Sequence, residues 1–88
     1  MNNYYYFQNG GVKVIKVYTT TSCPWCVKAK NYLKSRNISF QEANVGTDML
    51  AREEMLKKSK QMGVPVLDIN GIVIIGFDKP AIDVALTN

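Results

Sequence analysis

The segment that most clearly indicates the fold is residues 17–26, which read VYTTTSCPWC. It begins inside residues 12–18, where β-branched apolar residues recur and predict a strand. It ends with the only two cysteines of the chain, Cys23 and Cys26. Pro24 lies between them, and proline is favoured in the first turn of a helix because its missing N–H costs no hydrogen bond there. The cysteines are therefore expected at the passage from a strand to a helix, with Cys23 at or beside the helix N-cap.

The residues after the cysteine pair predict a helix, a strand and a second helix. Apolar residues at helical spacing carry the first helix to about residue 36, and residues 38–45 predict the second strand. Thr47 or Asp48 is expected to cap the second helix, because short polar side chains accept hydrogen bonds from its free N–H groups. Gly63 is expected to end that helix as a left-handed residue.

A hairpin and a last helix complete the predicted order. Residues 64–69 and 72–75 have the character of strands, and the Asn70-Gly71 pair between them favours a tight two-residue turn. Asp78 is expected to cap the last, short helix. The order strand, helix, strand, helix, hairpin, helix predicts an α/β domain with a four-stranded mixed sheet flanked by three helices.

Length and composition limit what the chain can be. Its 88 residues suffice for one domain, and 47% hydrophobic against 20% charged residues is ordinary globular usage. No apolar run approaches the roughly 20 residues of a membrane span, so we expect no membrane partner. No secretory signal is visible, and with only two cysteines this favours a reducing, cytoplasmic location. Residues 1–11, with four consecutive aromatics, are expected to be a flexible extension or a tag remnant, and residues 12–88 the folded domain.

The lack of histidine excludes several kinds of chemistry. The sequence holds no histidine, which removes Ser-His-Asp and Cys-His catalysis and histidine-ligated zinc sites. The net charge of +4 could suit a nucleic acid, but the sequence has no run of five or more cations interleaved with aromatics. Lys57, Lys58 and Lys60 are instead expected to complement the negative end of the second helix. We therefore expect no nucleic-acid partner.

The spacing of the two cysteines favours redox chemistry. Residues three apart on a helix lie close enough to open and close a disulfide with little backbone movement. The free N–H groups of the helix N-terminus favour a thiolate at Cys23, so Cys23 is expected to attack a substrate disulfide. Cys26, one turn further on the apolar face, is expected to resolve the mixed disulfide. A zinc site shared between two chains and a buried structural pair of thiols are the alternatives.

Three motifs of this sequence resemble the glutaredoxin family of the thioredoxin fold. They are Cys23-Pro24-Trp25-Cys26, Gly63-Val64-Pro65 and Gly76-Phe77-Asp78. The resemblance covers residues 12–87 and implies a dithiol-disulfide oxidoreductase with a thioredoxin-like fold. It also implies a cis peptide between Val64 and Pro65, and a Val64 backbone that pairs with the substrate beside Cys23. The substrate-binding residues that it implies are Thr21, Trp25, Val64, Pro65, Gly76, Phe77 and Asp78.

The sequence departs from the family where glutathione is bound. Thr20 stands where glutathione-using members usually have a cation, and Gly63 stands where they usually have threonine. Phe77 and Lys79 stand where a second glycine and an acidic residue are usual. The resemblance therefore leaves two external electron donors open, glutathione or a flavoenzyme such as thioredoxin reductase, and we expect the second.

The resemblance also implies partners and one alternative function. The expected partners are disulfide-bearing proteins or small disulfides, and the expected state is a monomer without a bound metal or cofactor. The alternative is a dimeric module that binds an iron–sulfur cluster, bridged through Cys23 of each chain with glutathione.

Overall fold

The computed structural model describes residues 14–87. Within that range four strands form one sheet in the order β3-β2-β4-β5. The strands β2 and β3 are parallel, and the pairs β2–β4 and β4–β5 are antiparallel. The strand bounds are Ile15–Thr19 for β2, Gln41–Asn44 for β3, Val66–Ile69 for β4 and Ile72–Ile75 for β5. The predicted mixed sheet is confirmed. The expectations for residues 1–11 and for the first two residues of the first strand lie outside the described residues.

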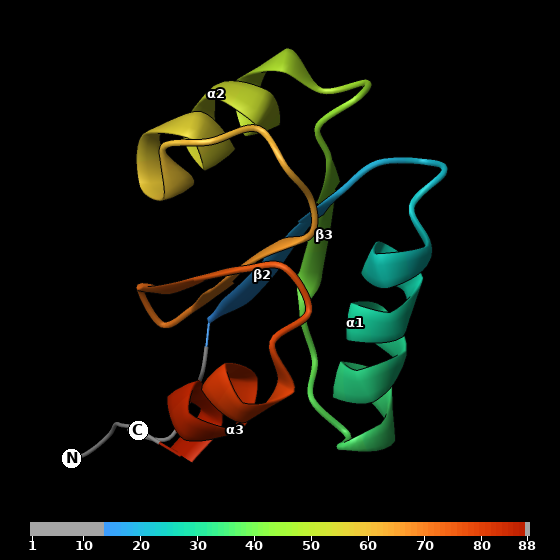
Figure 1. Ribbon diagram of the computed structural model, residues 1–88, viewed down its shortest axis with the longest axis vertical. Coiled ribbons are helices and arrows are strands. Elements are labelled where there is room, and N and C mark those ends of the chain that lie inside the picture. The colour runs from blue at the N-terminus through green and yellow to red at the C-terminus, as the bar shows by residue number, and fades with distance from the viewer. Residues whose placement is uncertain (1–13, 88) are drawn as a thin grey trace, which may run out of the picture.

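Three helices cover the sheet, as the sequence predicts. They are α1 (Pro24–Ser35), α2 (Met49–Ser59) and α3 (Lys79–Thr87). Helices α1 and α3 contribute to one cluster of buried side chains, and α2 contributes to a second. Figure 1 shows α2 set apart from α1 and α3, with the strands between them.

The strand β2 serves both clusters because its side chains alternate between the two faces of the sheet. Ile15 and Val17 belong to the cluster with α1 and α3, whereas Tyr18 belongs to the cluster with α2. All three side chains are buried. Thr19 ends the strand, fully buried, and two positions beyond Val17 it faces the same side as α1. The polar loop that follows then leads the chain to the first cysteine.

The helix starts follow the predicted capping chemistry. Cys23 is the N-cap of α1, with Pro24 in the first turn. Of the two candidates for the second helix, Asp48 is the N-cap, and its Oδ1 accepts hydrogen bonds from the N–H groups of Leu50 and Ala51, both at 3.1 Å. Each cap satisfies backbone donors that the helix itself leaves without a partner.

The end of α2 differs from the prediction. Lys60, with φ of 61°, is the left-handed residue that follows the helix, and the expectation that Gly63 plays this part is wrong. The chain turns earlier because the N–H of Lys60 still donates to the carbonyl of Leu56 at 2.9 Å, while its left-handed backbone leads the chain away from the helix. The sequence offered no signal for this, since lysine is not favoured in the left-handed region.

Besides β2, which begins at Ile15 although Val14 is expected in it, two strands begin later than the sequence suggests. The N–H of Ile38 donates to the carbonyl of Leu33 at 2.9 Å, and Asn37 has a left-handed φ of 58°. This is the hydrogen-bonding pattern that closes a helix, so Ile38 takes part in capping α1 and not in a strand, and β3 begins only at Gln41. The other late strand is β4, which begins at Val66, one residue beyond a proline that has no N–H to give to a ladder.

The hairpin turn is confirmed. Asn70 and Gly71 have φ values of 53° and 92°, which are the positive angles of the tight turn that asparagine and glycine favour. The N–H of Gly71 donates to Asp68 Oδ1 at 2.7 Å. Among residues 14–87 there is no helix both long enough and apolar enough to span a membrane.

Candidate active site

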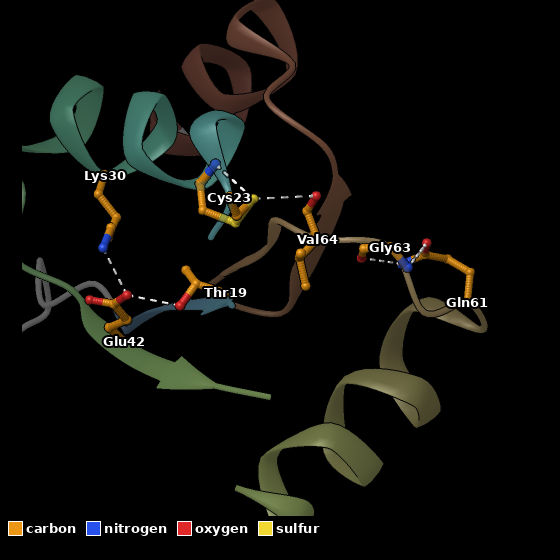
Figure 2. Close-up of a disulfide and its surroundings, with 8 residues drawn as sticks. Thr19, Cys23, Lys30, Glu42, Gln61, Gly63 and Val64 are labelled. Atoms are coloured by element: carbon orange, nitrogen blue, oxygen red, sulfur yellow. Dashed lines mark hydrogen bonds and ion pairs between the residues drawn. A yellow bond between two sulfur atoms is a disulfide. The ribbon is translucent and has the colours of Figure 1, made fainter. Parts of the chain in front are cut away.

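The two cysteines form a disulfide at the N-terminus of α1 (Figure 2). Their Cα atoms are 5.2 Å apart. The N–H of Cys26 donates to the Sγ of Cys23 at 3.2 Å, so the sulfur of the N-cap residue acts as the cap. The two residues differ in burial, because Cys26 is 1% exposed and Cys23 is partly exposed. A reactant can therefore reach the first sulfur but not the second.

A loop far along the chain brings a backbone carbonyl to this disulfide. The carbonyl oxygen of Val64 lies 4.0 Å from the Sγ of Cys23, and Figure 2 shows the two facing each other. The peptide between Val64 and Pro65 is cis. Both features agree with what the resemblance implies. A polar backbone group thus stands beside the reactive sulfur.

Five of the seven predicted substrate-binding residues line one shallow groove next to the disulfide. The groove has a volume of about 280 Å³, and its walls are mainly apolar. The residues that line it are Trp25, Val64, Pro65, Gly76 and Phe77. Such a groove suits an extended chain that carries its disulfide over Cys23.

The aromatic wall of the groove is built from two elements. The rings of Trp25 and Phe77 have centroids 6.4 Å apart, and Phe77 also meets Tyr32 edge to face at 5.9 Å. Trp25 nevertheless remains 57% exposed. The ammonium of Lys28 lies over its indole ring, 4.9 Å from the centroid. The groove thus has an exposed aromatic surface with a positive charge beside it.

Gly76 connects the groove to the hairpin. Its φ of 82° lies in the region that favours glycine. Its N–H donates to the carbonyl of Pro65 at 2.8 Å. The end of β5 is therefore held against the proline loop, which places Phe77 in the groove wall.

The other two predicted binding residues make contacts of their own. The hydroxyl of Thr21 accepts a hydrogen bond from Asn44 Nδ2 at 3.1 Å. Oδ1 of Asp78 accepts the N–H of Ala81 at 3.1 Å, as a cap of α3 does. Both side chains are exposed, and their part in substrate binding stays a prediction.

A group of three polar residues near the disulfide was not predicted from the sequence. The buried hydroxyl of Thr19 donates to Oε2 of Glu42 at 2.8 Å, and the same oxygen accepts from the Lys30 ammonium at 2.8 Å. These two hydrogen bonds, with Lys30 the stronger cause, hold the pKa of the Glu42 carboxyl below its usual range. Figure 2 shows the group on the side of the disulfide away from Gly63. The one sequence signal is that Lys30 falls four residues after Cys26, which puts both on one helix face.

Metal binding finds no support in the described part of the chain. Within residues 14–87 there is no group of three or more cysteine, aspartate or glutamate side chains arranged to hold a metal ion.

Comparison with known proteins gives a consistent result. Residues 15–74 match the family model described as Glutaredoxin. The chain is 57% identical over 70 residues to an uncharacterized glutaredoxin-like 8.6 kDa protein in the rubredoxin operon of Clostridium pasteurianum, covering 80% of this chain and 93% of that protein. It is 39% identical over 64 residues to glutaredoxin 3 of Escherichia coli K12, covering 73% and 77% of the two chains.

Solved structures give the same fold. The crystal structure of the thioredoxin-like protein BC3987 is 34% identical, with a TM-score of 0.76, and the match covers 81% of this chain and 97% of that one. The glutaredoxin of Archaeoglobus fulgidus is only 17% identical but has a TM-score of 0.79, covering 90% of this chain and 91% of that one. The predicted thioredoxin-like fold is confirmed.

Proposed function

The chain belongs to the glutaredoxin family, which supports a thiol-disulfide oxidoreductase type of function, and from that premise we propose that it reduces protein or low-molecular-weight disulfides by dithiol exchange. The observation that carries the proposal is the Cys23–Cys26 disulfide at a helix N-terminus, with one sulfur accessible beside an apolar groove. Short Cys-x-x-Cys bridges in this position exchange readily because the helix end stabilises a thiolate.

The reaction has two exchange steps that balance. In the reduced protein the Cys23 thiolate attacks one sulfur of the substrate disulfide, a mixed disulfide forms, and the first substrate thiolate leaves and takes up a proton. The Cys26 thiol then loses its proton and attacks the Sγ of Cys23. The second substrate thiolate leaves, and the internal disulfide of the structure is formed. Two electrons pass from the protein to the substrate.

The groove explains how a substrate is aligned for the first step. In-line attack needs the substrate sulfur close to Cys23 and the leaving sulfur pointing away. In the groove beside Cys23, the backbone of Val64 offers polar groups and the rings of Trp25 and Phe77 offer an apolar surface. A substrate with apolar neighbours of its cysteine fits this surface better than one with charged neighbours.

The experiment that tests the proposal uses both single cysteine variants. The reduced wild type is expected to reduce a disulfide-bearing protein under multiple turnover, and Cys23→Ser is expected to lose this activity. Cys26→Ser should accumulate a mixed disulfide with the substrate, visible as a covalent adduct by mass spectrometry. An active Cys23→Ser, or an adduct on Cys26 in the wild type, would contradict the assignment.

The electron donor that the proposal favours is a flavoenzyme such as thioredoxin reductase rather than glutathione. Glutathione binding depends on charge-assisted hydrogen bonds, and losing two of them weakens binding about a hundredfold. Thr20 supplies no cation. Asp78 is engaged as the cap of α3, and the ammonium of Lys79 lies over the ring of Tyr32, 5.2 Å from its centroid.

Two coupled assays decide between the donors. The oxidised protein is reduced with glutathione and glutathione reductase in one, and with thioredoxin reductase in the other, each followed by NADPH consumption. We expect faster turnover with thioredoxin reductase. Equal or faster turnover with glutathione would show that the substitutions do not weaken its binding.

The remaining features of the proposal concern partners and location. We propose a cytoplasmic monomer that uses no bound cofactor and contacts neither nucleic acid nor membrane. The iron–sulfur alternative has no support from the comparisons. Its bridging residue, Cys23, is here bonded to Cys26.

A further inference from the structure

The side-chain amide of Gln61 binds both polar backbone groups of Gly63 (Figure 2). The N–H of Gly63 donates to Gln61 Oε1 at 2.6 Å. Gln61 Nε2 donates to the carbonyl of Gly63 at 3.0 Å. One side chain therefore holds the residue directly before Val64 by two hydrogen bonds, much as a neighbouring strand would.

The amide is itself fixed to the end of α2. Gln61 Nε2 lies 3.1 Å from the hydroxyl oxygen of Ser59, to which it also donates. Ser59 is buried and its hydroxyl donates to the carbonyl of Met55 inside the helix at 2.8 Å. The backbone of Gly63 is thus tied through Gln61 to the last turn of a helix, although Gly63 itself is exposed.

This arrangement fixes the direction of one backbone donor. The carbonyl of Gly63 and the N–H of Val64 belong to the same planar trans peptide, in which they point in opposite directions. Holding the carbonyl toward Gln61 therefore turns the Val64 N–H away from Gln61. Among residues 14–87 no acceptor pairs with this N–H, and the carbonyl of the same residue lies 4.0 Å from Cys23 Sγ.

We propose that Gln61 is a positioning residue for the substrate, which orients the Gly63–Val64 peptide so that the Val64 N–H meets the backbone of a bound peptide disulfide. The inference rests on the proposed function and adds to it the residue that orients the Val64 backbone for the pairing with substrate that the family resemblance implies. Gln61 does not touch the reacting sulfurs and acts through the Gly63–Val64 peptide alone.

The contact between Gln61 and the backbone also depends on the lack of a side chain at Gly63. A Cβ on this residue would lie 2.8 Å from Gln61 Oε1, and the Gln61 side chain supplies all the atoms it would meet within 4 Å. The φ of Gly63 lies outside the left-handed region, so alanine is compatible with its backbone. A side chain at position 63 therefore excludes the Gln61 amide and little else. The glycine at position 63, where the family usually has threonine, therefore has a physical reason, because it leaves room for the Gln61 amide.

The test compares two substrates under single turnover. Reduced protein is mixed with excess disulfide, and its oxidation is followed by the fluorescence of Trp25, the only tryptophan of the chain. One substrate is the disulfide-linked dimer of an N-acetylated, C-amidated tripeptide with a central cysteine. The other is bis(2-hydroxyethyl) disulfide, which has no amide to pair with Val64. Each reaction oxidises the protein dithiol and releases two substrate thiols.

The variants separate positioning from general damage. Gln61→Ala should slow oxidation by the peptide disulfide by about three- to tenfold, the effect of one neutral hydrogen bond, and leave oxidation by bis(2-hydroxyethyl) disulfide little changed. Gly63→Ala should give the same pattern. Adding Gly63→Ala to Gln61→Ala should slow the reaction no further, because the clash partner is gone. Gln41→Ala, at the exposed start of β3, is the matched control and should behave as the wild type.

Other outcomes overturn the inference. Equal slowing with both substrates would mean that Gln61 only supports the site as a whole, and no slowing with either would mean that it orients nothing. Additive effects of the two substitutions would remove the coupling between Gln61 and Gly63. A wild type that neither disulfide oxidises would overturn the proposed function, and this inference with it.

Discussion

Cys23 and Cys26 are chemically different although they are three residues apart and bonded to each other. Cys23 caps the helix, where the N–H of Cys26 donates to its sulfur, and it is partly exposed. Cys26 lies one turn into the helix and is 1% exposed. Reactivity of a thiol follows its thiolate fraction and its accessibility, and both favour Cys23.

The first prediction follows from this difference. After reduction, iodoacetamide at about pH 6, well below the ordinary ionisation of a free thiol, should alkylate Cys23 much faster than Cys26. Peptide mapping by mass spectrometry at short times measures the two rates. A urea-unfolded sample is the control, in which the two cysteines should react alike. Equal rates in the folded protein would reverse the assignment of attacking and resolving sulfur.

Single residues of the site were predictable only where they form a local pattern. The cysteine pair, Pro24 and Trp25 are neighbours in sequence, so their chemistry could be inferred from spacing alone. Two sets of contacts could not be inferred in this way, namely the ion pair of Glu42 with Lys30 and the hydrogen bonds of Gln61 with Gly63. They depend on which polar atoms the folded chain brings together. Glutamate and glutamine on a solvated face have no sequence signature that sets them apart.

At the scale of elements, α2 is attached to the sheet by a polar network as well as by packing. Glu54 on this helix accepts hydrogen bonds from Lys16, at 2.7 Å, and from the hydroxyl of Tyr18, both on β2. Lys58, one turn later, bonds to Tyr18 and to Asp68 on β4, both at 2.7 Å. The network therefore links one helix to two strands.

The network shifts the ionisation of its members. The hydrogen bond from Lys16, and after it that from Tyr18, lower the pKa of Glu54 to about 2. Burial is the main cause that raises the pKa of Tyr18. Burial lowers the pKa of Lys58, but hydrogen bonds to Asp68 and Tyr18 outweigh it and raise the pKa overall. At neutral pH the Glu54 carboxylate is therefore charged and can accept the hydrogen bonds of the network.

The second prediction is an acid weakening of the fold. A carboxyl whose folded pKa is depressed from 4.5 to about 2 adds stability above its unfolded pKa, and this is lost as pH falls through that interval. The urea midpoint of the wild type should therefore drop between about pH 5 and pH 2. Glu54→Gln should have a lower midpoint at neutral pH and a shallower drop. Because Glu54 is 43% exposed, solvent screening keeps the effect modest.

Glu53→Gln is the matched control for that measurement. Glu53 is the exposed neighbour of Glu54 on the same helix. It should keep the pH dependence of the wild type. Identical pH profiles for Glu54→Gln and the wild type would show that the network does not contribute to stability.

Helix starts were predicted better than helix ends. Cys23 could be placed at or beside its cap because Pro24 marks the first turn, and the second cap could be narrowed to Thr47 or Asp48 because a cap combines a polar side chain with the helix pattern that follows it. The end of α2 could not, because a left-handed Lys60 ends it before the glycine. Residue preference is a weak guide there, since lysine is not favoured in the left-handed region.

At the scale of the whole molecule, the fold brings three distant segments to one point. The helix N-terminus carries the disulfide, the proline loop before β4 carries Val64, and the segment after β5 carries Phe77. The hairpin and the crossover helix are local and could be predicted, as could the mixed sheet. The family resemblance implied that the loops bring Val64 next to Cys23. The helical spacing of Lys30 from Cys26 was the one signal for the Glu42 group, and nothing in the sequence indicated the Gln61 contacts.

The burial of one sulfur has a kinetic consequence. Because only Cys23 is accessible, the substrate in one half of the cycle and the reductant in the other must both react at the same atom, within the same groove. They cannot be bound together, so electrons are taken up and handed on in alternation, and the first product departs before the second reactant arrives. Initial rates measured against substrate concentration, at several fixed concentrations of reductase, should therefore give parallel double-reciprocal plots. A large excess of substrate should inhibit, because it occupies the groove at Cys23 that the reductase needs. Intersecting lines would show that one of the two reactants binds or reacts elsewhere than at Cys23, although Cys26 is buried.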